Sequence, residues 1–68
     1  MKNNLEKLRN GCNLTQEQLA NKLKVTRQTI NSIEKGKYNP SIILAFKISK
    51  FFNTTIENVF IFQEDSYE

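Results

Sequence analysis

The sequence predicts an all-α fold of five short helices, and three observations support this fold class. Apolar residues recur three and four positions apart, which is the spacing of one helix face. Ser and Thr precede most of these periodic segments, where a helix needs an N-cap. The two glycines and the single proline of the 68 residues fall between the segments rather than inside them, as helix ends require.

The first helix is expected over residues 4–10, where Gly11 then provides the stop. The second helix opens at Thr15, because Thr15 and Gln18 form the T-x-x-Q pattern of a capping box. The apolar residues that these two helices would bury are Leu5, Leu8, Leu19, Ala20 and Leu23.

The third helix opens at Thr26, after a link of only two residues. That link is too short for an antiparallel hairpin, so the second and third helices must cross at a steep angle, as in a helix-turn-helix. The third helix would bury Ile30 and Ile33 and would end just before Gly36, which can adopt a left-handed conformation. The helix-turn-helix unit therefore covers residues 15–35.

Ser41, preceded by the one proline, is the expected N-cap of a fourth helix that runs to about Phe52. A T-x-x-E pattern, Thr54 and Glu57, predicts a capping box that opens the fifth helix. The tail VFIFQ, residues 59–63, has the β-branched and aromatic composition of extended structure. The fold class is therefore a compact five-helix helix-turn-helix domain, with a short C-terminal β segment as an additional option.

The fourth helix is apolar over more of its circumference than one core contact needs. At 100° per residue its apolar side chains cover about 220° of the helical wheel, roughly twice the arc that one core requires. The simplest use of the excess, together with the apolar tail, is a homodimer interface that includes a dimerisation segment over residues 51–63. The alternative for VFIF is a tail folded over its own core. The candidate interface residues are Phe46, Phe51, Phe60, Ile61 and Phe62.

The composition is that of one globular domain, residues 1–68, without a membrane span or a secretory signal. Histidine, the commonest general base and metal ligand, is absent, and two glycines are too few for a phosphate-cradling loop. The single cysteine, Cys12, has no partner for a disulfide or a metal, so we expect a small packing residue in a reducing cytoplasm, a redox switch being the alternative. We therefore expect no enzyme, no cofactor, no metal site, no membrane contact and no small-molecule ligand.

The charge is divided unevenly along the chain. Residues 1–50 carry all ten Lys and Arg and three Glu, a net charge of +7, whereas residues 51–68 carry four acidic residues and no base, a net charge of −4. A basic body is typical of a polyanion binder, because phosphate neutralisation drives such binding. Many mildly basic proteins bind no nucleic acid, so charge alone leaves both options open.

The polar face of the third helix has the chemistry of a base-reading surface. In a major groove, Gln28 and Asn31 suit adenine, and Arg27 suits guanine or a phosphate. A solvated helix face is usually rich in Glu and Lys, whereas this one carries Thr, Asn and Ser, which are poorer helix formers and so indicate a contact. The alternative is an ordinary solvated helix. The expected base readers are Arg27, Gln28, Asn31 and Ser32.

Residues on either side of the third helix are candidates for phosphate contacts. Gln16 stands at the start of the second helix, where the helix dipole and the first backbone N–H groups attract anions. Side chains just past the third helix lie where a DNA backbone would run. Each one singly is an ordinary surface residue, so the clustering is the informative feature. The candidates are Gln16, Thr26, Thr29, Lys35, Lys37, Tyr38 and Asn39.

The stretch LTQEQLANKLKVTRQTINSIEKGKYNPS, residues 14–41, resembles the phage-repressor-type (Cro/Xre) helix-turn-helix family, and the whole chain is similar to its small cytolysin-repressor-like bacterial members. The signature positions are Gln18, Ala20, Val25, Ile30, Glu34, Gly36 and Pro40. The resemblance implies a lambda-repressor-like fold whose third helix reads the major groove through the four residues named above. It also implies phosphate contacts by Gln16, Thr29, Lys37, Tyr38 and Asn39.

The resemblance further implies a partly buried ion pair between Arg9 and Glu34. Such a pair makes physical sense, because an exposed Glu on the reading helix would repel phosphate; the alternative is an exposed Glu that contributes little. Many relatives carry a second domain for ligand sensing or dimerisation, which is not seen in this sequence. A small-molecule effector is therefore in doubt.

Together these features predict a cytoplasmic, sequence-specific transcriptional regulator that binds double-stranded DNA as a homodimer. It is expected to repress by occupying an inverted-repeat operator, with its two reading helices about 34–36 Å apart. The first alternative is an antitoxin-like protein that binds a toxin and represses its own operon. The others are a protein-interaction module and an RNA binder, the latter disfavoured because the A-form major groove is too narrow for a helix.

Overall fold

The computed structural model describes residues 1–62, and five helices form within them. They are α1 (Leu5–Gly11), α2 (Gln16–Leu23), α3 (Arg27–Glu34), α4 (Ile42–Phe51) and α5 (Ile56–Val59). The all-α fold class is therefore confirmed. Residues 63–68, which include the last residue of the expected dimerisation segment, lie outside the described part. The longest of the five helices has 10 residues, about half of what a membrane crossing needs, and none of them can span a bilayer.

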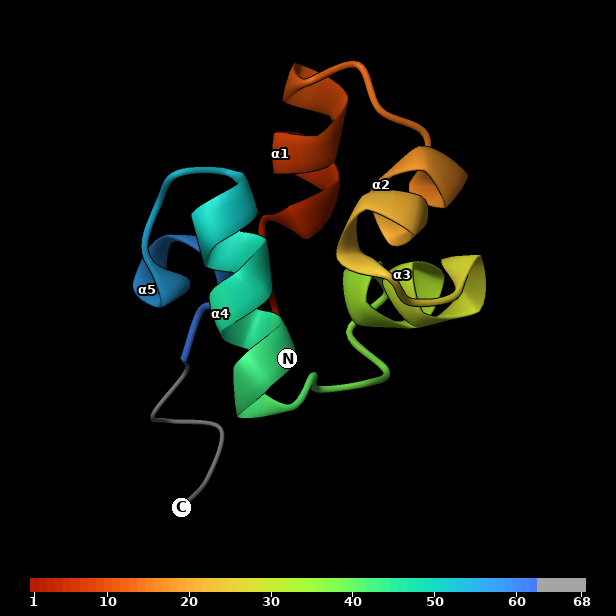
Figure 1. Cartoon of the computed structure of the whole chain (residues 1–68). Coiled ribbons are helices and arrows are strands. Elements are labelled where there is room, and N and C mark those ends of the chain that lie inside the picture. The colour runs from red at the N-terminus through yellow and green to blue at the C-terminus, as the bar shows by residue number, and fades with distance from the viewer. Residues whose placement is uncertain (63–68) are drawn as a thin grey trace.

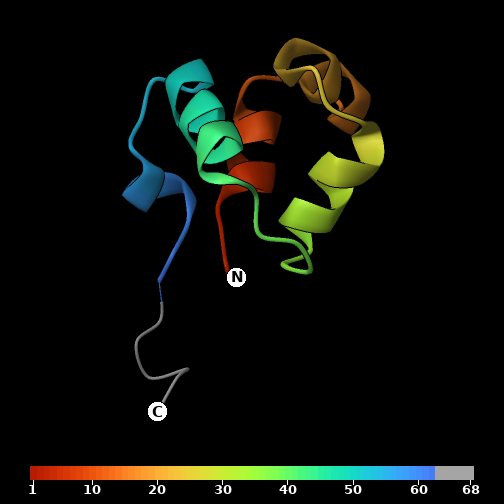
Figure 2. The same cartoon turned by 60° about the horizontal axis from the view of Figure 1, so that its bottom comes forward.

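The helix α1 lies between two groups of helices. Figures 1 and 2 both place α2 and α3 on one side of it and α4 and α5 on the other. The core where these elements meet consists of apolar side chains at the predicted helical spacing, and burying each large one stabilises the fold by about 1.5–3 kcal/mol. The fully buried large side chains are Leu5, Leu19, Ile30, Ile33, Ile48 and Val59.

The turn between α2 and α3 sets their steep crossing, which Figure 2 shows. Lys24 adopts a left-handed conformation with φ of 61°, which costs a residue other than glycine about 1–2 kcal/mol. The backbone N–H of Val25 then donates to the carbonyl of Ala20 at 3.0 Å and closes the end of α2. The Val25 side chain packs against the core. The predicted helix-turn-helix geometry is thus built on a strained backbone position.

Three of the four predicted N-caps are confirmed. The capping box of α2 is complete: the Thr15 hydroxyl accepts from the backbone N–H of Gln18 at 3.0 Å, and the Gln18 side chain accepts from the backbone N–H of Thr15 at 2.8 Å. Thr26 caps α3 and Ser41 caps α4 through the first kind of bond alone, in which the hydroxyl accepts from the backbone N–H three residues further on. Each such cap contributes about 1 kcal/mol.

The N-cap of α5 differs from the prediction. Thr55, rather than Thr54, caps this helix, so the expected capping box between Thr54 and Glu57 is wrong. The reason lies at the end of α4, where Asn53 is left-handed with φ of 55° and the backbone N–H of Thr54 donates back to a carbonyl of α4 at 2.9 Å. Because Thr54 still closes α4, the next residue is the first one free to cap α5.

The apolar tail pairs with the N-terminal segment of its own chain. The backbone N–H of Asn4 donates to the carbonyl of Val59 at 2.8 Å, and that of Ile61 donates to the carbonyl of Lys2 at 2.9 Å. These bonds make one isolated antiparallel bridge and, within residues 1–62, no strand. Phe60 is only 9% exposed and belongs to the core. The prediction of Phe60 as a dimer-interface residue is therefore wrong, because its ring is already covered within the protomer.

The wide apolar arc of α4 is only partly used by the core. Leu44, Ala45 and Ile48 are buried. Four other apolar side chains of the helix remain exposed: Ile42 at 71%, Ile43 at 67%, Phe46 at 53% and Phe51 at 37%. The excess that the helical wheel predicted is thus real in the protomer, and it leaves apolar surface facing outward.

A buried ion pair joins α1 to α3, as the resemblance implied. Arg9 Nε donates to Glu34 Oε2 at 2.7 Å and Arg9 Nη2 donates to Glu34 Oε1 at 3.2 Å; the two side chains are only 11% and 4% exposed. Arg9 Nη1 also donates to the carbonyl of Leu14 at 2.8 Å, which ties in the segment before α2. The hydrogen bond to Glu34 raises the pKa of the Arg9 guanidinium, so this guanidinium stays charged at any ordinary pH.

We expect Arg9→Met to lower the free energy of unfolding by about 3–5 kcal/mol, because it leaves the buried Glu34 carboxylate without its counter-charge. Urea denaturation followed by circular dichroism measures this loss. Lys7→Met, on the exposed side of the same helix, is the control and should change the free energy of unfolding by less than about 0.5 kcal/mol. A loss of about 1 kcal/mol or less for Arg9→Met would show that the pair behaves as a solvated surface pair instead.

Candidate nucleic-acid interface

The helix α3 has two unlike faces. Its inner face is anchored by Ile30 and Ile33, which have no exposed surface. All four expected base readers keep some solvent exposure on the rest of the helix. Arg27 and Gln28 are exposed, and Asn31 and Ser32 are partly exposed. The helix is thus fixed to the body by one side and open on the other.

Beside α3 lies a shallow hollow of about 220 Å³ that brings several predicted contacts together. Its lining comes from the start of α3, the middle of α3 and the loop that follows the helix. The residues that line it are Thr26, Gln28, Thr29, Ser32 and Tyr38. Two expected base readers and three expected phosphate contacts therefore share one continuous surface.

The hydroxyls of Thr26 and Thr29 are partly committed inside the protein. Thr26 Oγ1 caps α3 by accepting from the backbone N–H of Thr29 at 3.2 Å, and the two hydroxyl oxygens lie 3.0 Å apart in a hydrogen bond of their own. Two hydroxyls carry two protons, and this bond uses one of them. At most one proton of the pair is therefore left for a phosphate, so the two threonines form one donor rather than two.

The Gln16 side chain lies differently from the prediction. Its Nε2 group donates to Glu34 Oε1 at 2.9 Å and to Asn31 Oδ1 at 3.2 Å. Both amide protons are thus used inside the protein, so donation of the Gln16 amide to phosphate stays a prediction and would require one of these two bonds to break. The physical reason is the buried carboxylate of Glu34, whose remaining lone pairs need donors. What the start of α2 can still offer an anion is its backbone N–H groups and the helix dipole.

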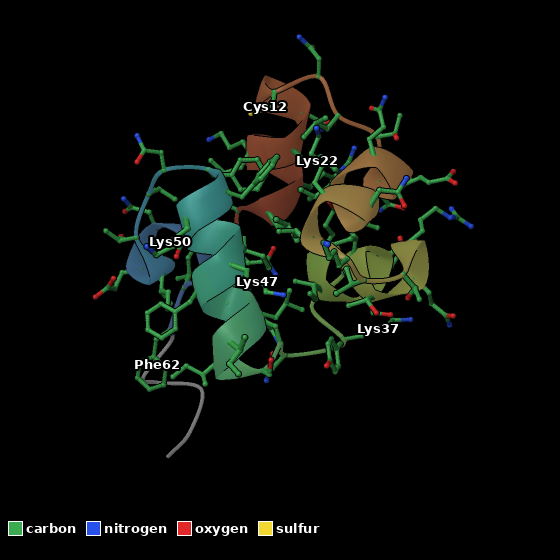
Figure 3. The ribbon with its side chains drawn as sticks, viewed as in Figure 1. Cys12, Lys22, Lys37, Lys47, Lys50 and Phe62 are labelled. Carbon is green, nitrogen blue, oxygen red and sulfur yellow. The ribbon has the colours of Figure 1, made fainter. Side chains whose placement is uncertain are left out.

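The loop after α3 is held against the helix end and projects its side chains outward. Gly36 has a φ of 75°, and the backbone N–H of Lys37 donates to the carbonyl of Ser32 at 3.0 Å. Asn3 Nδ2 fastens the same helix end by donating to the carbonyl of Ile33 at 2.8 Å. Figure 3 shows Lys37 on this loop, next to α3. The exposed candidates for phosphate here are Lys35, Lys37, Tyr38 and Asn39.

A second basic surface was not identified from the sequence. A hollow of about 420 Å³ between the end of α2 and α4 is lined by four lysines around two apolar side chains, and Figure 3 labels three of these lysines. The lining residues are Lys22, Leu23, Lys24, Lys47, Lys50 and Phe51. Within residues 1–62 no lysine is paired with a carboxylate, so this charge is uncompensated. The i, i+3 spacing of Lys47 and Lys50 was the available signal, but their approach to α2 is a tertiary feature.

Comparison with known proteins agrees with this geometry. Residues 5–59 match the sequence profile of the helix-turn-helix family. The chain is 62% identical over 65 residues to an uncharacterized HTH-type transcriptional regulator of Methanocaldococcus jannaschii, an alignment that covers 96% of this chain and 98% of that one. It is 46% identical over 66 residues to the uncharacterized HTH-type transcriptional regulator YgzD of Bacillus subtilis, covering 97% and 100% of the two chains.

A longer relative shares the same region. The chain is 49% identical over 55 residues to the HTH-type transcriptional activator BcrR of Enterococcus faecalis, which covers 81% of this chain and 27% of that protein. The similarity there is confined to a part of the longer protein, whereas the archaeal and Bacillus relatives match over nearly their whole lengths. The chain therefore belongs to the Cro/C1 (phage-repressor) type of the helix-turn-helix family, a family of DNA-binding transcriptional regulators.

Proposed function

We propose that this protein is a sequence-specific, homodimeric repressor that inserts α3 into the major groove of an inverted-repeat operator. The observation that carries the proposal is the division of α3 into a fully buried side, Ile30 and Ile33, and an open polar side that begins with Arg27 and Gln28. A helix held by one face can enter a groove with the other without disturbing the core. Repression then requires only that the dimer occupy promoter DNA.

The exposed side chains of α3 have the donors and acceptors that base edges require. Gln28 can pair bidentately with adenine through its amide, and Arg27 can pair with O6 and N7 of guanine or with a phosphate. Ser32 lies one turn further along α3 and in the same hollow as Gln28, and it offers a hydroxyl to either adenine or guanine. The side chains that open the helix therefore carry most of the sequence preference.

The loop and its lysines provide the contacts that do not depend on sequence. Lys35 and Lys37 are exposed cations directly after α3, and Tyr38 and Asn39 add neutral donors. Phosphate contacts of this kind fix the register of the helix in the groove and carry the salt dependence of binding. The shared hydroxyl proton of Thr26 and Thr29 is a further donor on the same side.

A second copy of this chain is the partner we propose for the exposed apolar surface of α4. Phe46 lines a hollow of about 600 Å³ between α4 and α5, and Phe62, beyond the end of α5, is 61% exposed. Exposed apolar side chains at several positions of so small a chain are a solubility liability unless a copy covers them. Phe51 lines the lysine hollow instead, where a second copy would bring like charges together. The proposed interface is therefore Ile42, Phe46, Ile61 and Phe62.

The proposed function is tested by selecting bound duplexes from a random pool. Recovery of an inverted repeat supports it, and recovery of no common sequence contradicts it.

Within the recovered site, Gln28→Ala should weaken binding by about 1–3 kcal/mol and relax the preference at one base pair of each half-site, because it removes a bidentate reader. Fluorescence anisotropy with matched duplexes measures both. Asn21→Ala, an amide loss on α2 away from α3, should leave both unchanged.

Lys37→Ala should weaken binding to every duplex alike and reduce the slope of log affinity against log salt by about one, because one phosphate contact is lost. Titrations at several salt concentrations, with specific and random duplexes, measure the slope. Lys7→Ala removes the same charge from α1 and should leave the slope unchanged. An equal effect from both variants would mean that only the net charge matters and that Lys37 makes no localised contact.

Phe62→Asp and Phe46→Asp should each produce monomers, because a carboxylate cannot be buried in an apolar interface without large cost. Sedimentation velocity measures the change, and circular dichroism checks that the helices persist. Phe51→Asp, which faces the lysine hollow, should remain dimeric. If both interface variants stay dimeric the interface lies elsewhere, and if the wild type copurifies with a second small protein the antitoxin alternative is favoured.

A further inference from the structure

Four side chains from three helices form one connected hydrogen-bonded chain beneath the open face of α3. It begins at Arg9 on α1, whose guanidinium holds the carboxylate of Glu34. Glu34 Oε1 accepts from Gln16 Nε2 at 2.9 Å, and Gln16 Nε2 also donates to Asn31 Oδ1 at 3.2 Å. This series of hydrogen bonds therefore runs from a fixed positive charge in the interior to Asn31, a residue that we expect to contact a base.

The direction of every bond in this chain follows from the charge at its start. A guanidinium can only donate, and Arg9 donates to Oε2 of Glu34 at 2.7 Å and to Oε1 at 3.2 Å, so both carboxylate oxygens act as acceptors. Gln16 must therefore present its NH2 group, not its carbonyl, to Glu34. The same NH2 group lies beside the Asn31 amide, and two NH2 groups cannot bond to each other. Asn31 must then present its carbonyl oxygen to Gln16, since the opposite orientation would lose the bond.

This chain leaves Asn31 with a defined polarity. An amide on an open helix face can ordinarily rotate by 180° and offer either its carbonyl or its NH2 group at a given point. Here the carbonyl is directed at α2, and Asn31 Nδ2 bonds to no group within residues 1–62. The residue is partly exposed, so its NH2 group can be reached from outside. The group held ready for a ligand is thus a donor.

We propose that Gln16 is a positioning residue that makes Asn31 a donor-only reader of DNA. The proposal rests on the proposed role of α3 in the major groove. The base opposite Asn31 must then present an acceptor, which guanine does through O6 and N7, thymine through O4 and adenine through N7. Cytosine presents only the N4 donor and is disfavoured there. This replaces the expected bidentate recognition of adenine, which needs the Asn31 carbonyl as well as its NH2 group.

Duplex selection with the full chain tests the proposal, and four variants separate its parts. Asn31→Ala identifies the base pair that Asn31 reads. At that base pair the wild type should disfavour cytosine by about tenfold, as the loss of one hydrogen bond predicts. Gln16→Met, which keeps the length of the side chain but has no donor, should reduce this preference to about threefold or less and leave all other positions unchanged. Thermal unfolding of each variant monitors the fold.

Asn31→Asp reverses the polarity without using the Gln16 substitution. An aspartate can still accept from Gln16, but it presents only acceptors outward, so the preference at the same base pair should move toward cytosine, whose N4 group is a donor. Asn21→Asp introduces the same charge on α2 and should lower the affinity for all duplexes without moving any preference. If Gln16 had only a structural role, Gln16→Met would lower the stability of the fold and would leave the base preference at the Asn31 position unchanged.

The outcomes are distinguishable from those of the proposed function. If the wild type recovers an inverted repeat but Gln16→Met weakens all sequences equally, Gln16 is a structural or phosphate-contacting residue and the proposal is overturned while the repressor function stands. If Asn31→Asp keeps the wild-type preference, Asn31 reads no base through its donor and the proposal is likewise overturned. If the wild type recovers no sequence, the proposed function itself fails.

Discussion

The ion pair between Arg9 and Glu34 is the interaction on which the arrangement of α3 depends. It is the only ion pair within residues 1–62, it is almost fully buried, and it joins elements that are far apart in sequence. A buried carboxylate at the end of α3 has to be neutralised and its lone pairs satisfied, and that requirement draws Arg9 from α1 and Gln16 from α2 to the same point. The position of α3 is thereby fixed from two sides by charge as well as by apolar packing.

The second constraint is the short turn before α3. The turn forces Lys24 into a left-handed conformation, and a helix of eight residues has too few hydrogen bonds to be stable alone. The cap by Thr26 and the complete burial of Ile30 and Ile33 offset these costs. Because the stability comes from the cap and the inner face, the outer face can carry Asn31 and Ser32, which are poor helix formers, without loss of the element.

Local patterns in the sequence were sufficient for the existence of the five helices and for the caps at Thr15, Thr26 and Ser41, because each depends on residues within one turn. The expected stop at Gly11 is wrong, because α1 includes Gly11 and the left-handed residue that follows the helix is Asn13. Local patterns failed where a distant or competing contact decides. Thr54 looked like a cap and instead closes α4; Phe60 looked like an interface residue and instead packs on the core beside the N-terminal segment. In the candidate site, the sequence likewise predicted neither the contacts of the Gln16 side chain nor the hollow lined by four lysines, because the partners of these residues come from other helices.

The exposed apolar surface of α4 is best understood from how little DNA contact so small a protein can make alone. A single reading helix with its loop can bury only about 600–1,000 Å² of protein surface on DNA, which gives one such module modest affinity. Two modules held rigidly at the spacing of successive major grooves bind with the affinity of both, since the second contact becomes intramolecular. Covering Ile42 and Phe46 with a second copy would remove exposed apolar surface and fix that spacing in one step. The same exposed apolar residues that lower the solubility of a monomer would thus form the two-fold dimer that an inverted repeat requires.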